Sequence, residues 1–502
     1  MADLLKPGAT QEKADEARTS FLVGAITVSG MVKSTLGPKG MLKLLYTQNG
    51  QPIITNDGAT VLKNIVPAGA SSKILINAAK EHGETEGDGT TTLTVLTGGL
   101  LHEADKLIFK GAHPYKIIAE YRKAHKKAMD VLKSISKECA DDKERLALAK
   151  TTLSSKFSPI ELQSLSELAL KVSKKIGKKI DMLNIIKIEG GEVSDSYMHD
   201  GLLIECDIGP GQKDAWDNPR VLIINTSLDT DKVKIFGSKA AVTSPKELEK
   251  LEMAENKRMS EKVQKISQHA DVIVNRQIIY DYPTQEFTKH GKTSIERADF
   301  SGVEMLAKVL DGRILSTFDS VVESDVGRCN RFERVKMQER VFCSFTGGLK
   351  DGACSIVIRG PSKEILEECE RSLVGAIKVL MNTSDRYVFG GGSAEAAVAY
   401  LIHPTTEGER AYARALLEIT RSLAENAGMP SDEIVDKISE YNSQGAHSYG
   451  IGSNGPECMD AHGVRESLRL KEIIWSKAAE TAEVLLRCDN NIKCRPRERV
   501  QE

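Results

Sequence analysis

A glycine-rich hexapeptide, Gly87–Thr92, constrains the fold of this chain more than any other stretch. It reads Gly-Asp-Gly-Thr-Thr-Thr, and an apolar stripe with helical spacing begins directly after it at Leu93. We therefore expect a tight turn that leads into the first turn of a buried helix. Glycine lets the backbone approach a phosphate closely, and a helix start supplies unpaired N–H donors and the positive end of the helix dipole.

This hexapeptide has two interpretations. In the first, Asp88 is a hard oxygen ligand that suits a magnesium ion bridging phosphates, and the threonine hydroxyls add further donors. In the second, the segment is only a capped helix after a glycine-rich turn. The hexapeptide alone does not separate the two.

Three more turns of this kind lie far apart in the sequence, at Gly37–Gly40, Thr55–Gly58 and Gly390–Gly392. The first ends a helical pattern, and its freed N–H groups together with Lys39 form a candidate anion cradle. In the second, Asp57 is either a functional carboxylate or only a turn or cap residue. A triphosphate with magnesium needs several backbone donors and at least one carboxylate. Because the P-loop pattern G-x-x-x-x-G-K-S/T is absent, the four turns indicate a nucleotide site outside the ordinary P-loop class.

The remaining sequence indicates a multidomain α+β protein. A chain of this length is expected to form about three domains. Helical patterns dominate both ends of the chain, whereas short β-rich runs appear after Gly201, which predicts an α/β segment inserted within a helical frame. Within this insert, Ser244–Glu247 forms a capping box that begins a charged helix ending near His269. That helix is either an ordinary surface helix or one that projects and meets a partner only at intervals.

Composition excludes several classes of protein. The 69 Lys and Arg residues nearly balance the 71 Asp and Glu residues, so the total charge indicates neither a nucleic-acid groove nor an anionic membrane surface. None of the nine cysteines belongs to a C-x-x-C pair, which argues against a zinc ribbon or a redox motif. Residues 1–6 show no signal peptide, and the longest apolar run, Phe21–Val32, is too short to span a bilayer. We therefore expect a soluble, cytoplasmic chain with reduced thiols.

Over essentially all of its length the chain resembles a subunit of the group II chaperonins. The motifs that carry this resemblance are Val32–Met41, Thr55–Thr60, Gly87–Thr92, Gly390–Gly392 and Val464–Ser467. Two further segments are most similar to the beta-subunit branch of the eukaryotic cytosolic chaperonin, TRiC or CCT, namely Asp229–Ser238 and Val274–Tyr280.

The resemblance implies three domains and a large assembly. A mostly helical equatorial ATP-binding domain would comprise residues 1–137 and 385–502, a small helical intermediate domain 138–201 and 352–384, and an inserted α/β apical domain 202–351. The charged helix after Ser244 would belong to a helical protrusion that acts as a built-in lid. Chaperonins of this type are hetero-oligomeric double rings of about sixteen paralogous subunits. They enclose non-native proteins, with actin and tubulin as expected clients, and need neither nucleic acid nor a membrane.

Two apical segments, Tyr282–Phe287 and Phe300–Leu310, would face the client protein. Three apolar residues of the second segment suit the domain core equally well: Phe300, Val303 and Leu306. We expect at least half of them to be core.

The resemblance also assigns site residues. ATP or ADP with Mg²⁺ would contact Leu36, Gly37, Pro38, Gly89, Thr90, Thr91, Thr92, Ser155, Lys156, Gly391, Gly392, Glu466 and Lys471. Among these, Lys156 would sense the terminal phosphate, while Glu466 and Lys471 would lie near the base and ribose. Asp88 would hold the magnesium ion, and Asp57 would help to position the attacking water.

One departure from the family pattern matters for hydrolysis. Where the family has His-Asp, this chain has Val374 and Gly375. The family's aspartate orients or deprotonates the water, which glycine cannot do, and losing such a group commonly costs about 10²–10⁴-fold in rate. Glu368, about 10 Å away by helix rise, is not expected to replace it. We therefore weigh two functions, an ATP-driven folding subunit and a subunit that binds ATP but hydrolyses it slowly or not at all.

Overall fold

A computed structural model describes residues 10–46, 50, 52–67, 69–228, 245–317, 321–347 and 352–493. These residues form an α+β protein, as the sequence predicts, in two compact units. The helical unit combines Met1–Ser173 with Ser362–Glu502, and the sheet-rich unit is Lys174–Pro361. The division into three domains stays a prediction. Within the described ranges, every helix is too short or too polar to span a membrane.

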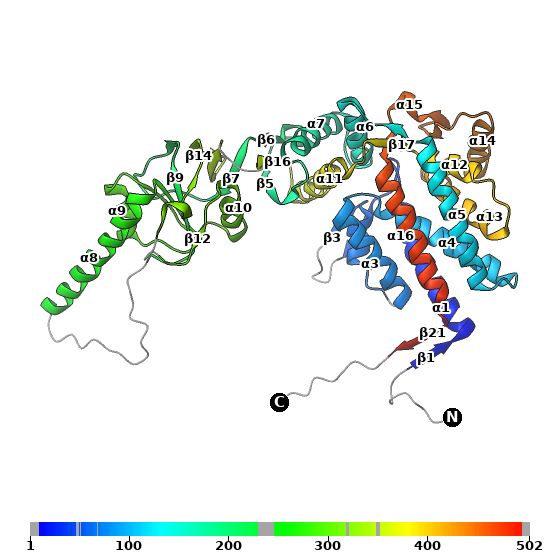
Figure 1. The fold of residues 1–502 in the computed structure, drawn as a ribbon, viewed down its shortest axis with the longest axis horizontal. Helices are drawn as coiled ribbons and strands as arrows, with labels where there is room; N and C mark the ends of the chain where they lie inside the picture. Colours follow the sequence, from blue (N-terminus) through cyan, green and yellow to red (C-terminus); the bar gives the residue numbers. More distant parts are fainter. Residues whose placement is uncertain are drawn as a thin grey trace. The chain divides into compact units, whose positions relative to one another are not determined.

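The helical unit is built around α4 (Thr90–Phe109), the helix predicted from Leu93 onward. Side chains of α4 are buried on almost every side, because α1 (Ala14–Lys33), α13 (Glu407–Asn426) and α16 (Leu468–Arg487) pack around it (Figure 1). A single apolar core joins side chains from both ends of the chain. The two ends therefore fold together.

Further helices that begin in this unit are α2 (Gly58–Asn64), α3 (Ala70–Glu86), α5 (Pro114–Ile135), α6 (Asp142–Leu153), α7 (Pro159–Ile176), α11 (Lys363–Asn382), α12 (Ser393–Leu401), α14 (Ser431–Ser443) and α15 (Met459–His462). Short antiparallel strands join distant segments: β1 (Thr10–Lys13) with β21 (Asn490–Lys493), β2 (Lys43–Tyr46) with β3 (Pro52–Thr55), β18 (Tyr449–Ile451) with β19 (Pro456–Cys458), and β17 (Arg386–Phe389) with both β4 (Lys137–Glu138) and β20 (Arg465–Ser467).

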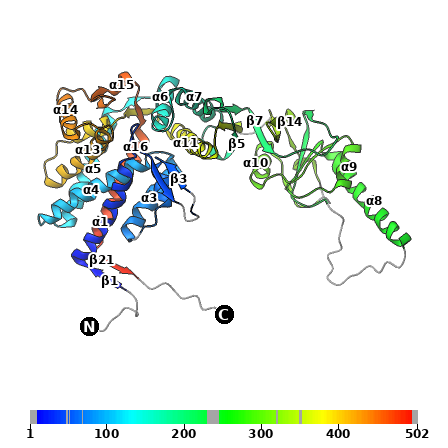
Figure 2. The ribbon, with the colours of Figure 1, turned by 180° about the vertical axis from the view of Figure 1, so that it is seen from behind.

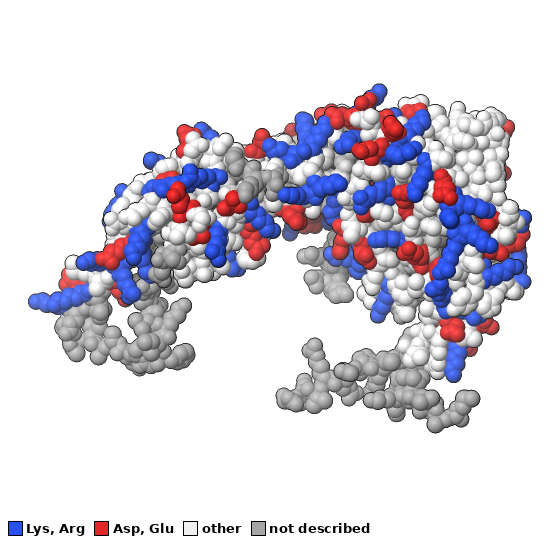
Figure 3. Space-filling model, viewed as in Figure 1, with Lys and Arg blue, Asp and Glu red and all other residues white. Residues whose placement is uncertain are grey.

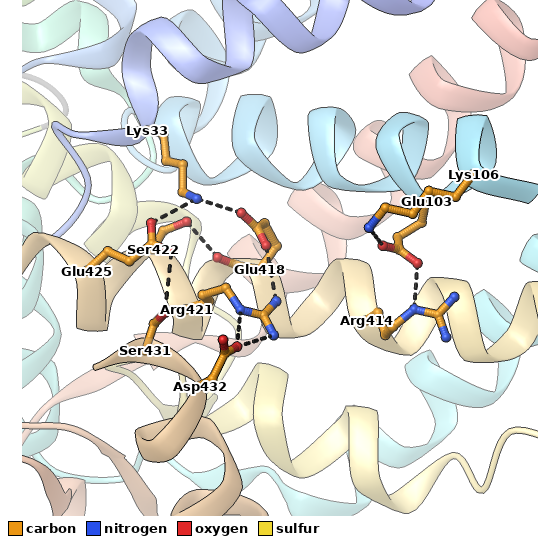
Figure 4. A network of polar contacts seen from close by, with 10 residues as sticks. All are labelled: Lys33, Glu103, Lys106, Arg414, Glu418, Arg421, Ser422, Glu425, Ser431 and Asp432. Atoms are coloured by element: carbon orange, nitrogen blue, oxygen red, sulfur yellow. Dashed lines mark hydrogen bonds and ion pairs between the residues drawn. The ribbon is translucent and has the colours of Figure 1, made fainter. Parts of the chain in front are cut away.

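Charged side chains hold α1 against α13 (Figure 4). Lys33, the last residue of α1, places its Nζ 2.7 Å from Glu418 Oε1 and 3.0 Å from Glu425 Oε2. Burial lowers the pKa of Lys33, but the two carboxylates outweigh burial and raise this pKa overall, so the ammonium stays charged. Asn426 donates hydrogen bonds of 3.0 and 2.8 Å from Nδ2 to the backbone oxygens of Lys33 and Leu36. The end of α1 and the turn after it are thereby fixed in place.

The sheet-rich unit contains the α/β segment predicted after Gly201. One sheet has the order β11 (Thr293–Ile295), β10 (Val272–Asn275), β9 (Arg220–Ile224), β12 (Ile314–Leu315) with parallel neighbours, and β13 (Gly327–Arg328) pairs antiparallel with β9. A second, antiparallel sheet has the order β7 (Gly201–Glu205), β15 (Arg340–Thr346), β14 (Arg331–Met337), β8 (Ala215–Asp217). In a third, β16 (Cys354–Gly360) lies between β5 (Leu183–Glu189) and β6 (Tyr197–His199). Short 3-10 helices are η1 (Ile180–Met182), η2 (Val193–Asp195) and η3 (Glu323–Asp325).

The charged helix predicted after Ser244 is α8 (Pro245–His269). Ser244 itself, like the segment Asp229–Ser238, lies outside the described residues. The later turns of α8 bury Met259, Val263 and Ile266 in the sheet-rich unit, whereas residues 252–258 are exposed. In Figures 1 and 2 one end of α8 extends away from the strands of this unit. The helix is thus anchored by one half and exposed along the other.

Helices α9 (Asp281–Lys289) and α10 (Phe300–Leu310) complete this unit. In α10, Val303 and Leu306 are buried in the core, as expected for at least half of the three apolar residues. Phe300 is 53 % exposed, with the guanidinium carbon of Arg276 4.7 Å from the centre of its ring. Of the three, Phe300 is therefore the exposed side chain.

Candidate functional site

A cavity of about 570 Å³ lies within the helical unit, in the size range of small-molecule sites. Turns and helix ends that are far apart in the sequence line it. The lining includes most of the predicted binding residues: Leu36, Gly37, Pro38, Asp88, Gly89, Thr92, Ser155, Gly391, Gly392, Glu466 and Lys471. Four other predicted residues do not line it: Asp57, Thr90, Thr91 and Lys156.

Two of the turns reach the cavity in backbone conformations that favour glycine. Gly89, the N-cap of α4, has a φ of 85°, and a Cβ added there would lie 2.3 Å from Ile474 Cδ1. Gly37 also has a φ of 85°, and its added Cβ would lie 2.4 Å from Leu423 Cδ2. The wall of the cavity is therefore backbone at these points, and the first turn of α4 directs its positive dipole end into the cavity.

Asp88 supplies a buried carboxylate beside this helix start. Its Oδ1 accepts a 2.7 Å hydrogen bond from the backbone N–H of Gly89, and Thr152, at the end of α6, also lines the cavity. Burial raises the pKa of Asp88, and the Gly89 hydrogen bond and the charge of Lys156 offset this only in part. A divalent cation at this carboxylate would favour its ionised form. One carboxylate and nearby hydroxyls form the donor set of a magnesium ion that takes its other ligands from phosphates and water, so the residues fit the ion.

A buried ion cluster forms another part of the cavity wall. Lys471, on α16, is 2 % exposed, and its Nζ contacts Glu395 Oε1 and lies 2.7 Å from Glu466 Oε2. Burial by itself lowers the pKa of Lys471, but the two carboxylates reverse this and raise the pKa, which keeps the ammonium charged. Burial raises the pKa of Glu466, and this residue lines the cavity.

Asp57 lies behind the cavity wall and caps α2. Its Oδ2 accepts hydrogen bonds from Thr60 N at 2.9 Å and Thr60 Oγ1 at 2.8 Å, so Asp57 is the N-cap of α2. The role of Asp57 in positioning the attacking water stays a prediction. Burial alone would raise the pKa of Asp57, but Lys156 and the Thr60 hydrogen bonds lower it overall. The hydroxyls of Thr90 and Thr91 border the next residue, Gly58, where an added Cβ would lie 2.2 Å from Thr91 Oγ1. Asp57 therefore adjoins the start of α4 even though it does not line the cavity.

Gly375, on α11, touches the turn that leads to Asp88. A Cβ added to Gly375 would lie 2.6 Å from the backbone oxygen of Gly87. The helix thus approaches the turn backbone to backbone, and no side chain at position 375 fits unless one of them moves. Glycine at this position therefore has two consequences. It lacks the carboxylate of the family's aspartate, and it allows the close backbone contact with Gly87.

Replacing Gly375 with alanine is expected to destabilise the helical unit by about 1–3 kcal/mol, the cost of overpacking a site that cannot relax. Alanine gains about 1 kcal/mol in helix propensity over glycine, which is smaller than the cost of a clash with a backbone oxygen. Gly30→Ala on α1 is a matched control, because an added Cβ there meets nothing within 4 Å. Urea denaturation of both variants compares them. If urea denaturation shows that both variants are more stable than wild type, the close backbone contact at Gly375 is contradicted.

Sequence reasoning missed two charged groups near the site, Glu395 and Arg465, and the ion pair of a third, Glu368. Glu395 is fully buried in the first turn of α12, where an acidic residue in an alanine-rich apolar helix was the available signal. Arg465 lines the cavity, with Nη1 3.3 Å from Glu144 Oε1. Glu368, on α11, ion-pairs with Lys156 at 3.5 Å. For the last two, no local pattern identifies the partner, since each lies hundreds of residues away.

Comparison with known proteins adds independent findings. The model of the TCP-1/cpn60 chaperonin family matches residues 28–496. T-complex protein 1 subunit beta of Saccharomyces cerevisiae is 42% identical to this chain over 510 residues, which cover 97% of each protein. The subunit beta proteins of Encephalitozoon cuniculi and Homo sapiens are 41% and 39% identical and cover 99% and 100% of this chain and 98% of their own lengths. The predicted resemblance to the beta-subunit branch is confirmed by these matches.

Proposed function

Because the chain belongs to the TCP-1/cpn60 chaperonin family, we propose that it is the beta-type subunit of a cytoplasmic, hetero-oligomeric double-ring chaperonin. The family match over residues 28–496, combined with similarity to beta subunits from end to end, carries this proposal. In it, the subunit helps to enclose and fold non-native proteins, with actin and tubulin as expected clients. Nucleic acid is not an expected partner, because the 69 Lys and Arg residues nearly balance the 71 Asp and Glu residues. On the face seen in Figure 3, positive and negative side chains are interspersed.

The cavity of the helical unit would bind ATP or ADP with Mg²⁺. Support comes from the backbone walls at Gly37 and Gly89 and from the buried carboxylate of Asp88. The start of α4 would hold the phosphates, and Asp88 the magnesium ion, which neutralises phosphate charge when bound. Glu466 would lie near the base and ribose, with Lys471 behind it.

Particle size and nucleotide binding test this function. The tagged chain, purified from its own cells, is expected to sediment as a ring of about sixteen subunits together with paralogous chains. Imaging the particle with and without ATP should show that the ring closes when ATP is added. A 54.9 kDa monomer without chaperonin paralogues contradicts the proposal.

A second candidate function is a subunit of the same ring that binds ATP but hydrolyses it poorly. Gly375 favours it, because the family pattern places a catalytic aspartate at this position. Asp57 and Asp88 argue against a complete loss of nucleotide chemistry, since both carboxylates are retained. The two candidates differ only in turnover.

Single-turnover hydrolysis by the assembled ring separates these candidates. We expect slow turnover in the wild-type subunit and an increase of about 10²-fold in Gly375→Asp. Gly375→Ala is the control, because alanine brings the same Cβ clash without a carboxylate. Fast hydrolysis that is equal in wild type and Gly375→Asp excludes the poor-hydrolysis candidate.

A further inference from the structure

Lys156 does not line the cavity, although its neighbour Ser155 does. Its Nζ lies instead between two carboxylates, 3.5 Å from Asp57 Oδ1 and 3.5 Å from Glu368 Oε1. All three side chains are largely enclosed, with 14%, 22% and 20% of the lysine, aspartate and glutamate side chains exposed. Solvent therefore screens their interactions only weakly.

Both carboxylates are held by other contacts. Asp57 Oδ2 is occupied by the two hydrogen bonds from Thr60. Glu368 Oε2 accepts hydrogen bonds from Arg371 Nη2 at 2.7 Å and from Thr55 Oγ1 at 3.3 Å. The remaining oxygen of each carboxylate is the one that faces Lys156. One oxygen of each acid is thus fixed by other contacts, and the other oxygen faces Lys156.

The backbone next to Lys156 is also tied to this region. Asn56 Nδ2 donates a 2.8 Å hydrogen bond to the backbone oxygen of Ser155. The loop after α6, the start of α2 and the second turn of α11 therefore meet beside the part of the cavity wall formed by Ser155. An anion that enters the cavity on this side competes with Asp57 and Glu368 for a single ammonium group.

We propose that Glu368 is a positioning residue that holds Lys156 away from the cavity and so sets how strongly the site distinguishes a nucleoside triphosphate from a diphosphate. This inference rests on the proposed nucleotide-binding function. In this proposal the terminal phosphate of a triphosphate draws Lys156 from its carboxylates, and a diphosphate lacks that group. The release of Glu368 opposes the movement of Lys156. Glu368 therefore acts on the nucleotide through Lys156 and has no direct contact with the reacting atoms.

Glu368→Gln tests the proposal in the full-length chain. Glutamine retains the shape and the hydrogen-bond acceptor but removes the charge that competes with phosphate. Calorimetry with magnesium and a non-hydrolysable ATP analogue is expected to show binding about tenfold tighter than in wild type. Affinity for magnesium–ADP should change by less than about twofold. In the proposal ADP does not draw Lys156 from its carboxylates, so it binds equally well whether or not Glu368 is charged. Glu367→Gln on the same helix is the matched control and should change neither affinity.

A second variant separates positioning from a general structural effect. In a Lys156→Met background, Glu368→Gln should no longer change the ratio of the two affinities, because the residue through which it acts is gone. An unchanged ratio in the Glu368→Gln single variant, or equal changes for both nucleotides, overturns the inference while leaving nucleotide binding intact. Absence of any nucleotide binding by wild type overturns the proposed cavity function as well, which is a distinguishable result.

Discussion

Replacing Lys471 with methionine is expected to lower the free energy of unfolding of the helical unit by about 3–5 kcal/mol, the usual cost of removing one partner from a buried ion cluster. Methionine leaves Glu395, which is fully buried, and Glu466 without their shared cation. Burial then forces at least one carboxylate to take up a proton or to draw in water. The fluorescence of Trp475, which is buried on the same helix, follows the unfolding in urea in a Trp216→Phe background.

Two further variants show whether the effect comes from the cluster. Lys477→Met, also on α16, removes a lysine that is 28 % exposed and lies 3.9 Å from Glu81, so its cost should stay below about 1 kcal/mol. Adding Glu395→Gln to Lys471→Met should recover part of the lost stability, since one unpaired charge disappears. If Lys471→Met and Lys477→Met lower the free energy of unfolding equally, the effect does not come from the buried ion cluster.

Replacing Asp88 with asparagine is expected to weaken magnesium-dependent triphosphate binding at least a hundredfold, because even the outer-shell partners of a metal are each worth about 10–100-fold in affinity. Asparagine keeps the size of the side chain and an acceptor for the Gly89 N–H, but it loses the charge that would bind the ion. Titration of magnesium at a fixed nucleotide concentration measures the change.

The nucleotide-free chain should respond in the opposite way. Since burial raises the pKa of Asp88, its charge is unfavourable without a cation, and Asp88→Asn should unfold at an equal or slightly higher urea concentration than wild type. Asp105→Asn, an exposed change on α4, the helix that follows Asp88, controls for the loss of one charge. Unaltered magnesium dependence in Asp88→Asn removes Asp88 from the metal site.

Local physics accounts for what could be predicted from the sequence. The spacing of apolar residues after Leu93 predicted α4, because a helix repeats every 3.6 residues and buries whichever face is apolar. The β-branched runs after Gly201 predicted the inserted strands for the same kind of reason. Gly37 and Gly89 were identifiable as turn residues, since a positive φ suits glycine far better than other residues.

Partners at long range could not be predicted in this way. Periodicity shows which face of a helix is buried, but it does not show which element covers that face. Glu395 and Lys471 are 76 residues apart, and Lys156 and Glu368 lie on separate parts of the chain, so their pairing depends on how α6, α11, α12 and α16 pack. The position of Lys156 beside the cavity rather than in its wall follows from that packing too.

The sequence by itself therefore determined the elements, the glycine turns and the family, because each of these depends on residues that are close together or on motifs that are matched directly. Only the tertiary structure decided that α11 meets the Gly87 turn through a bare backbone, and that two acids hold Lys156. These features arise where surfaces from distant segments come into contact, and their energies depend on burial and distance, which no local pattern specifies.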